Sequence, residues 1–88
     1  MVVKSFRVID PAGIHARPAS ILSQKVMSYK GDVKIKFAEK EGNLKSIMSI
    51  MALGIKQNSE FSIAVDGEGS EEMLLSLEST LVENNIVK

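Results

Sequence analysis

The stretch of the chain best suited to chemistry is GIHARPAS, residues 13–20, which holds the only histidine, His15, and an arginine two positions later, Arg17. Imidazole changes its charge near neutral pH, and its neutral form is a nucleophile. An arginine guanidinium carries a fork of N–H donors that matches a phosphate group. The pair is therefore a candidate site at which His15 attacks a phosphoryl group and Arg17 stabilises the product.

The residues around His15 indicate the start of a helix. If His15 is the capping residue, residues 16–18 form the first turn, where backbone N–H groups have no partner inside the helix. Pro18 is tolerated there because its missing N–H would have bonded nothing, and Gly13 lets the chain bend into the helix. Free N–H groups at a helix start attract anions, so the backbone of Ala16 and Arg17 is a candidate phosphate-binding site.

A simpler interpretation of the same residues is also open. His15 could be a solvated capping residue and Arg17 an ordinary surface charge. No carboxylate is visibly paired with the imidazole, so a triad of the hydrolase type is not expected. The residues alone make a phosphoryl site plausible and leave both interpretations standing.

A second segment of interest is SIMSIMAL, residues 46–53, which Gly54 follows. Serine at a helix start accepts a hydrogen bond from a backbone N–H and stabilises the helix by about 1 kcal/mol. Glycine is the usual residue just beyond a helix. We therefore expect Ser46 to cap a short helix. Apolar residues lie all round this short helix, and there are more of them than one buried face can hold. Some of them should therefore be exposed.

The composition excludes several classes of function. Residues 1–88 are enough for one small domain, and a single domain is expected. Lys+Arg and Asp+Glu are both 11, which gives no general attraction to nucleic acid or to an anionic membrane. With no cysteine and one histidine, thiolate catalysis and metal sites of these ligands are excluded, and no cofactor is expected. No membrane span or signal peptide is recognisable, so a cytoplasmic protein is the default.

Hydrophobic periodicity predicts four strands and three helices. Strands are expected at 2–9, 32–37 and 61–66. Residues 38–43 are expected to form a turn that leads into a short return strand, although Gly42 comes late in it and Ala38-Glu39 is not a favoured hairpin pair. Helices are expected from His15 or Ala16 to about residue 29, from Ser46, and from Ser70, which should cap the last helix. The inward side chains are predicted to be Val2, Phe6, Val8, Ala19, Leu22, Val26, Met27, Val33, Ile35, Phe37, Phe61, Ile63, Val65, Met73, Leu74, Leu77, Leu81 and Val82.

The predicted order, β-α-β-β-α-β-α, implies an α+β protein of two layers. Strands that are apolar on one face need a cover, and the amphipathic helices supply it on one side of the sheet. The other face of the sheet should be wet, since it carries Lys34, Lys36, Ser62 and Asp66.

GIHARPAS resembles the active-site motif of the HPr family, the histidine-containing phosphocarriers of the bacterial phosphoenolpyruvate:sugar phosphotransferase system. NLKSIMSIMALGI, residues 43–55, resembles the regulatory-serine motif of the same family. The resemblance covers essentially the whole chain. It implies an open-faced β-sandwich, in which three helices cover one face of a four-stranded antiparallel sheet. It also implies a carrier rather than an enzyme: His15 would accept a phosphoryl group on Nδ1 beside Arg17.

The same resemblance implies a docking surface and a regulatory site. The docking positions would be Ser20, Ile21, Ile47, Met48 and Met51. Their apolar members could instead belong to the core, but exposed methionine suits a surface that must fit several partners. Ser46 would be the target of an HPr kinase/phosphorylase, as in Gram-positive-type relatives, and a phosphate is compatible with a helix start.

The implied partners are phosphorylated enzyme I, the A component of a sugar-specific enzyme II, the HPr kinase/phosphorylase and a catabolite-control regulator, and the carrier is expected to be a monomer. A rival interpretation is a purely regulatory module that is phosphorylated only on serine and acts as a corepressor partner. The presence of His15 with Arg17 argues against it, since such a module needs no nucleophile. A free-standing hydrolase or transferase ranks last, because no acid–base pair is visible.

Overall fold

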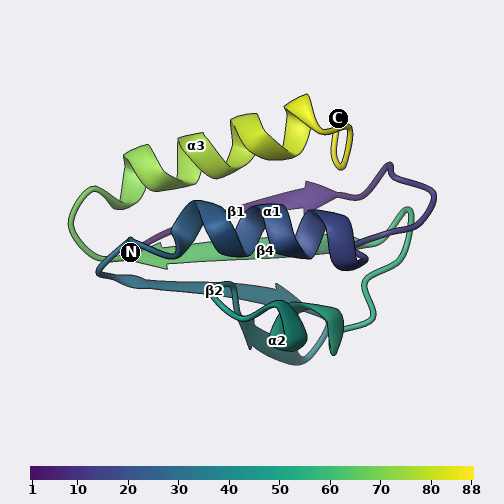
Figure 1. Ribbon diagram of the computed structural model, residues 1–88, viewed down its shortest axis with the longest axis horizontal. Helices are drawn as coiled ribbons and strands as arrows, with labels where there is room; N and C mark the ends of the chain where they lie inside the picture. Colours follow the sequence, from purple (N-terminus) through teal and green to yellow (C-terminus); the bar gives the residue numbers. More distant parts are fainter.

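The computed structural model describes all residues from 1 to 88 and contains seven elements in the predicted order (Figure 1). The strands are β1 (Val2–Arg7), β2 (Asp32–Phe37), β3 (Lys40–Asn43) and β4 (Glu60–Asp66), and the helices are α1 (Ala16–Val26), α2 (Ile47–Met51) and α3 (Ser70–Glu83). The first strand is shorter than its predicted range 2–9, because the pairing with β4 ends at Arg7 opposite Glu60. Val8 instead forms an isolated bridge with Val87.

The four strands form one antiparallel sheet in the order β1-β4-β2-β3. In β2, apolar and charged side chains alternate: Val33 and Ile35 face the core and are buried, whereas Lys34 and Lys36 point to the other face and are exposed. All three helices lie on one face of this sheet: α1 packs against α2 and α3, and α3 packs against β1 and β4 (Figure 1). The predicted open-faced β-sandwich is therefore confirmed.

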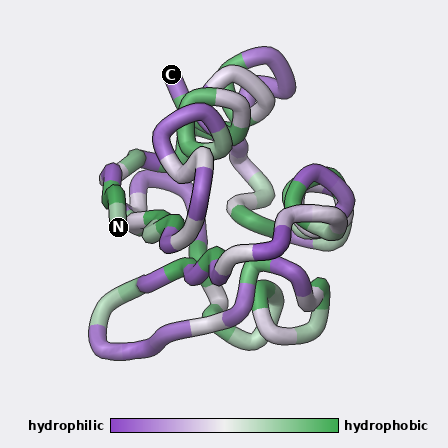
Figure 2. The backbone as a smooth tube through the Cα atoms, turned by 90° about the vertical axis from the view of Figure 1, so that its left-hand side faces the viewer, coloured by the Kyte–Doolittle hydropathy of each residue, from purple (hydrophilic) through white to green (hydrophobic).

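The core lies between the sheet and the helices and consists of one cluster of 20 buried hydrophobic residues. Ala19, Leu22 and Val26 supply the inner face of α1, and Leu74, Leu77 and Leu81 supply that of α3. Figure 2, turned by 90°, shows that hydrophobic and hydrophilic residues alternate around the helical coils, as expected for helices that cover only one face of a sheet.

Three of the predictions for the helices are wrong. Met27 lies beyond the end of α1 and is 57% exposed, and Val82 points away from the core and is 44% exposed. Ser70 does not cap α3: Gly69 occupies the capping position with φ 73°, and Ser70 is the first residue of the helix. A left-handed residue at that position favours glycine over serine, so the backbone conformation decided the cap. Glu71 and Glu72 do lie in the first turn, as predicted.

The prediction of a turn over residues 38–43 is wrong, because residues 40–43 already form β3 and the hairpin is tighter than expected. Phe37 is opposite Lys40, so only Ala38 and Glu39 form the turn, and Ala38 has φ 56°. Gly42 lies within β3 and not in the turn, and a Cβ atom there would come 3.0 Å from the Ser49 hydroxyl of α2. The glycine therefore allows the close packing of α2 on the sheet rather than the turn.

The opposite face of the sheet has no cover and is polar, as predicted. Lys34 and Lys36 are exposed there and both pair with Glu41, at 3.4 and 3.6 Å respectively. Asp66 is exposed and Ser62 is half-buried. None of the three helices is long and apolar enough to span a membrane.

Candidate functional site

The loop between β1 and α1 is fixed to the body of the protein at Gly13 and Ile14. The Ile14 N–H donates to the carbonyl oxygen of Ile55 at 3.0 Å, and the Ile14 side chain is buried. Gly13 has φ 69°, and a Cβ atom there would lie 2.4 Å from the same carbonyl oxygen. Only glycine fits at position 13, and the contacts of Gly13 and Ile14 with Ile55 determine where His15, the residue after Ile14, is placed.

His15 occupies the capping position of α1, as predicted, but its side chain makes no capping hydrogen bond. Its carbonyl oxygen accepts from the Ala19 N–H at 3.0 Å, and its side chain is 38% exposed. The N–H groups of Ala16 and Arg17 have no acceptor within the chain. Pro18 is buried in the first turn. The helix therefore begins with two free donors beside an accessible imidazole, an arrangement that favours an anion.

Asp10 contacts both candidate residues, and the sequence interpretation missed it. Its Oδ2 atom lies 3.6 Å from His15 Nε2 and 3.3 Å from Arg17 Nη2. The expectation that no carboxylate accompanies the imidazole is therefore wrong. A signal was present, since aspartate at the start of a loop often accepts a bond from the backbone two residues on. The Ala12 N–H indeed donates to Asp10 Oδ1 at 2.9 Å.

The carboxylate of Asp10 is stabilised in its ionised form. The hydrogen bond from the Ala12 N–H is the main reason that the pKa of Asp10 lies below its ordinary value of 3.8. Partial burial acts in the opposite direction, and the nearby His15 and Arg17 add to the lowering. At neutral pH the candidate site therefore contains one carboxylate, one guanidinium and one imidazole.

The second predicted segment, residues 46–53, begins with a serine whose side chain caps the helix. Ser46 precedes α2, and its Oγ atom accepts from the Ser49 N–H at 3.2 Å, as expected of a capping serine. Next to it, the Ser23 hydroxyl donates to the Lys45 carbonyl oxygen at 3.0 Å, which ties α1 to the start of α2. Ser46 itself is half-buried.

The apolar residues of α2 divide between the core and the surface. Ile50 is fully buried, whereas Ile47, Met48 and Met51 are 38%, 80% and 43% exposed. The other two predicted docking positions, Ser20 and Ile21, are half-buried on α1, which packs beside α2. The five residues thus come from two neighbouring helices, and three of them form an exposed apolar surface on α2.

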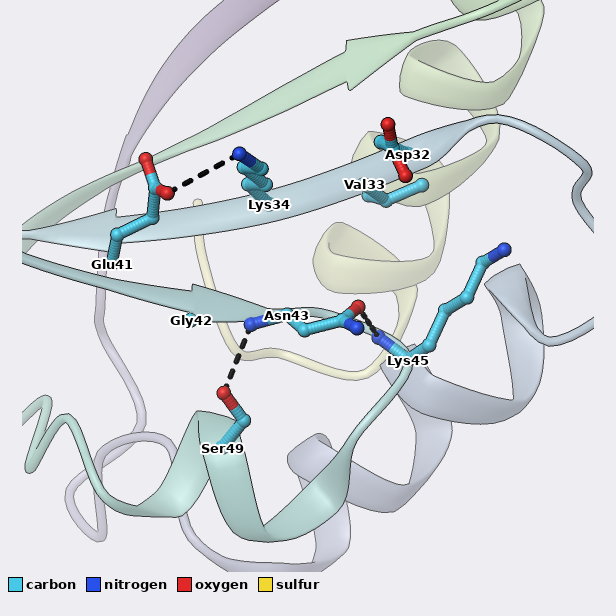
Figure 3. Close-up of a pocket in the computed structure, with 8 residues that line it drawn as sticks. All are labelled: Asp32, Val33, Lys34, Glu41, Gly42, Asn43, Lys45 and Ser49. Atoms are coloured by element: carbon cyan, nitrogen blue, oxygen red, sulfur yellow. Dashed lines mark hydrogen bonds and ion pairs between the residues drawn. The ribbon is translucent and has the colours of Figure 1, made fainter.

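The largest hollow described in the surface lies between β2, β3 and residues 45–49, beside the start of α2, and none of its lining residues belongs to α1 or to the loop before it (Figure 3). It has a volume of about 350 Å³ and is lined by Asp32, Val33, Lys34, Glu41, Gly42, Asn43, Lys45 and Ser49. Its polar groups largely bond one another, since the Ser49 hydroxyl accepts from the Asn43 N–H and the Asn43 side chain accepts from the Lys45 N–H, both at 2.9 Å. No group of three His, Cys, Asp or Glu side chains in the structure could hold a metal ion.

The fold is an open-faced β-sandwich of the α+β class, defined by the sheet order and by the three helices on one face. Its candidate site is a histidine at the start of the first helix. A family model described as the PTS HPr component phosphorylation site matches residues 2–83. The chain belongs to the HPr family of phosphocarrier proteins of the phosphotransferase system.

Several HPr proteins resemble the chain over nearly its whole length. The phosphocarrier protein HPr of Lysinibacillus sphaericus is 40% identical over 88 residues, which are 100% of both chains. The HPr of Mycoplasma genitalium is also 40% identical, over 97% of this chain and 100% of its own. The solved histidine-containing phosphocarrier protein of Mycoplasma superposes with a TM-score of 0.96 at 33% identity and covers 99% of both chains. Crh, the Bacillus subtilis catabolite repression protein, in a crystal form with a swapped dimer, gives 0.72 at 30% identity over 100% of both.

Proposed function

We propose that this protein carries a phosphoryl group on His15, which it accepts from phosphorylated enzyme I and passes to the A component of a sugar-specific enzyme II. The observation that carries the proposal is the accessible imidazole at a helix start whose first N–H groups, on Ala16 and Arg17, have no partner. Nε2 faces Asp10, while Nδ1 makes no hydrogen bond within the chain. Nδ1 is therefore the nitrogen proposed to receive the phosphoryl group.

In the proposed reaction, the Nδ1 electron pair forms the new N–P bond while the bond from phosphorus to the donor breaks. The donor leaves with the bonding electrons. The phosphoryl oxygens can then receive hydrogen bonds from the two free backbone N–H groups at the helix start. Transfer onward is the same step in reverse with a different acceptor, and imidazole is a suitable carrier because it is also a good leaving group.

Arg17 is proposed to stabilise the charge on the phosphoryl group as it moves. Its guanidinium is 51% exposed and touches Asp10 through Nη2 only. The other donors of the fork remain available for phosphoryl oxygens, which an arginine can bind in pairs. Backbone N–H groups would thus fix the position of the group, and Arg17 would stabilise its charge.

We further propose that enzyme I and the enzyme II A component dock on the surface formed by Ser20, Ile21, Ile47, Met48 and Met51. Three of these side chains are exposed and apolar, and the surface lies on α1, which begins at His15, and on α2, which packs against α1. The flexible methionine side chains can adapt to more than one partner. On this proposal the carrier acts as a cytoplasmic monomer.

Ser46 is the proposed regulatory site, phosphorylated by an HPr kinase/phosphorylase and then recognised by a catabolite-control regulator. Its hydroxyl lies at the start of α2, next to Ile47 in the proposed docking surface. The rival candidate, a module phosphorylated only on serine, is supported by the similarity to the Bacillus subtilis catabolite repression protein. The open site at His15 favours the carrier.

The deciding experiment is incubation with enzyme I and labelled phosphoenolpyruvate. A carrier should take up one label per chain, in a form that is labile in acid and stable in base, as expected of a phosphohistidine. The absence of such a label, together with phosphorylation of Ser46 by the kinase, would favour the purely regulatory module instead.

A further inference from the structure

Asp10 is the most deeply placed charged group of the candidate site. Its side chain is 13% exposed, whereas those of His15 and Arg17 are 38% and 51% exposed. Nothing in the proposed transfer step uses this carboxylate directly. A mostly buried charge beside a proposed nucleophile therefore needs an explanation of its own.

The backbone around Asp10 holds the carboxylate in place from several directions. The Ala12 N–H donates to Oδ1, and the Gly13 N–H donates to the Asp10 carbonyl oxygen, both at 2.9 Å. The preceding residue, Ile9, donates its N–H to the carbonyl oxygen of Ile86 at 2.8 Å and accepts from the Gln57 side chain at 3.2 Å. These bonds fix one carboxylate oxygen and leave the other, Oδ2, to face both the guanidinium of Arg17, at 3.3 Å, and the imidazole of His15, at 3.6 Å.

An ionised carboxylate is only an acceptor, so it favours a neighbouring ring nitrogen that carries the proton. Oδ2 of Asp10 is 3.6 Å from Nε2 of His15, beyond the length of a normal hydrogen bond but within strong electrostatic reach. We propose that Asp10 is a positioning residue: it holds the His15 proton on Nε2 and so keeps the electron pair of Nδ1 free to attack. This inference rests on the proposed phosphoryl transfer to His15.

The charge changes during the transfer point to the same role. When Nδ1 gives its electron pair to phosphorus, the donor departs with the electrons of the broken bond and Nε2 keeps its proton. The ring therefore becomes positively charged without any proton moving. A carboxylate fixed beside Nε2 stabilises that ring more strongly after the transfer than before it, which is the condition for acceleration of the step.

Two substitutions separate positioning from a merely structural role in the loop. Asp10→Asn keeps a carbonyl oxygen that can accept from the Ala12 N–H, but it places an NH₂ group where Oδ2 was. That group donates to Nε2 and so favours the proton on Nδ1, the form that cannot attack. Asp10→Ala removes both the loop contact and the charge. Asp32→Asn is the matched control, because Asp32 is an exposed aspartate at the start of β2.

The tautomer of His15 should be measured by the ¹⁵N chemical shifts of its ring nitrogens at mildly alkaline pH, and the rate of labelling by enzyme I and phosphoenolpyruvate should be measured in parallel. We expect the proton on Nε2 in wild type and in Asp32→Asn, and a shift towards Nδ1 in Asp10→Asn. Labelling of Asp10→Asn should be slower by at least about tenfold, and no faster than that of Asp10→Ala.

The inference is overturned if Asp10→Asn has the tautomer of wild type, whatever its rate, because the loop contact alone would then explain any loss. It is also overturned if Asp10→Ala is slow and Asp10→Asn is labelled at the wild-type rate. Failure of the proposed function is a different result, since in that case even wild type takes up no label, and the ¹⁵N shifts still decide whether Asp10 sets the tautomer.

Discussion

The starts of α1 and α2 leave their backbone N–H donors in opposite states. At α1, His15 does not bond to the helix, and the N–H groups of Ala16 and Arg17 have no partner. At α2, the hydroxyl of Ser46 already accepts from the Ser49 N–H. A capped start stabilises the helix, whereas an uncapped start beside an accessible imidazole leaves backbone donors free for an incoming anion.

The side chains around the two helix starts also differ, being charged at α1 and mostly apolar at α2. At the α1 start, the carboxylate of Asp10 lies 3.6 Å from the imidazole of His15 and 3.3 Å from the guanidinium of Arg17. The α2 start lies beside the exposed side chains of Ile47, Met48 and Met51. Charge is concentrated where chemistry is proposed, and apolar surface is concentrated where binding is proposed.

The largest effect is expected from His15→Ala, which should abolish labelling by enzyme I and phosphoenolpyruvate. No other histidine is present, and the His15 side chain makes no capping bond, so the free energy of unfolding should stay within about 0.5 kcal/mol of wild type. Labelling assays and denaturant unfolding measure the two quantities. One acid-labile label per chain on the alanine variant would contradict the role of the open helix start.

Arg17→Ala should slow transfer by about 100-fold, as the loss of a charge-stabilising donor does elsewhere. The guanidinium is half exposed and its partner Asp10 is held by the backbone, so stability should change little. Rates of phosphorylation by enzyme I and of transfer to the enzyme II A component should both be measured. Lys45→Ala, a cation removed beside the other helix start, is the control and should keep both rates near those of wild type.

Ser46→Asp should reduce the rate of His15 labelling by about tenfold, because it places a charge at the edge of the proposed apolar docking surface. A phosphate, with about −1.5 to −2 charges, should act more strongly than aspartate with one. The helix start accommodates a negative charge, so circular dichroism should show the helices intact. Equal rates would contradict interference at the interface, and a lost helical signal would point to unfolding instead.

Ser46→Ala should destabilise the protein by about 1 kcal/mol, since it removes the cap of α2. The comparison with His15→Ala tests the contrast between the two helix starts directly. Removal of the capping hydroxyl of Ser46 should lower the free energy of unfolding, whereas removal of the His15 side chain, which makes no capping bond, should leave it nearly unchanged. Chemical denaturation of both variants decides this. Equal losses for the two would mean that His15 supports its helix as Ser46 does.

The smallest effect concerns acid stability. Because the pKa of Asp10 is lowered in the folded protein, the ionised carboxylate favours the folded state above its ordinary pKa of 3.8. That contribution should be lost as the pH falls through the folded-state pKa below 3.8. Unfolding free energies of wild type and Asp10→Asn should therefore differ at neutral pH and converge in acid. A difference that stays constant over the whole range would exclude the carboxylate charge as its cause.

Local patterns were enough to predict the elements and both helix starts. The alternation of Val33 and Ile35 marks a strand directly, and Ser46 before an apolar run marks a helix cap. These signals need only neighbouring residues. For the same reason the element order could be predicted, and the family resemblance of the two motifs then completed the arrangement of the layers.

The errors concern contacts between residues that local patterns do not connect. The position of Asp10 beside His15 depends on how the loop folds over Gly13 and Ile55, which no periodicity encodes. Met27 continued the apolar pattern of α1, but the helix had already ended. Gly42 was interpreted as a turn residue because its contact, the Ser49 hydroxyl, belongs to a later helix.

The uncovered, charged face of the sheet is a suitable attachment site for single-molecule experiments. The chain contains no cysteine, so Lys36→Cys would create a unique thiol on the side away from all three helices. A dye or a surface linker attached there would leave both helix starts pointing towards the solution. Arrival and departure of a partner enzyme could then be timed on an immobilised carrier whose helical face is unobstructed.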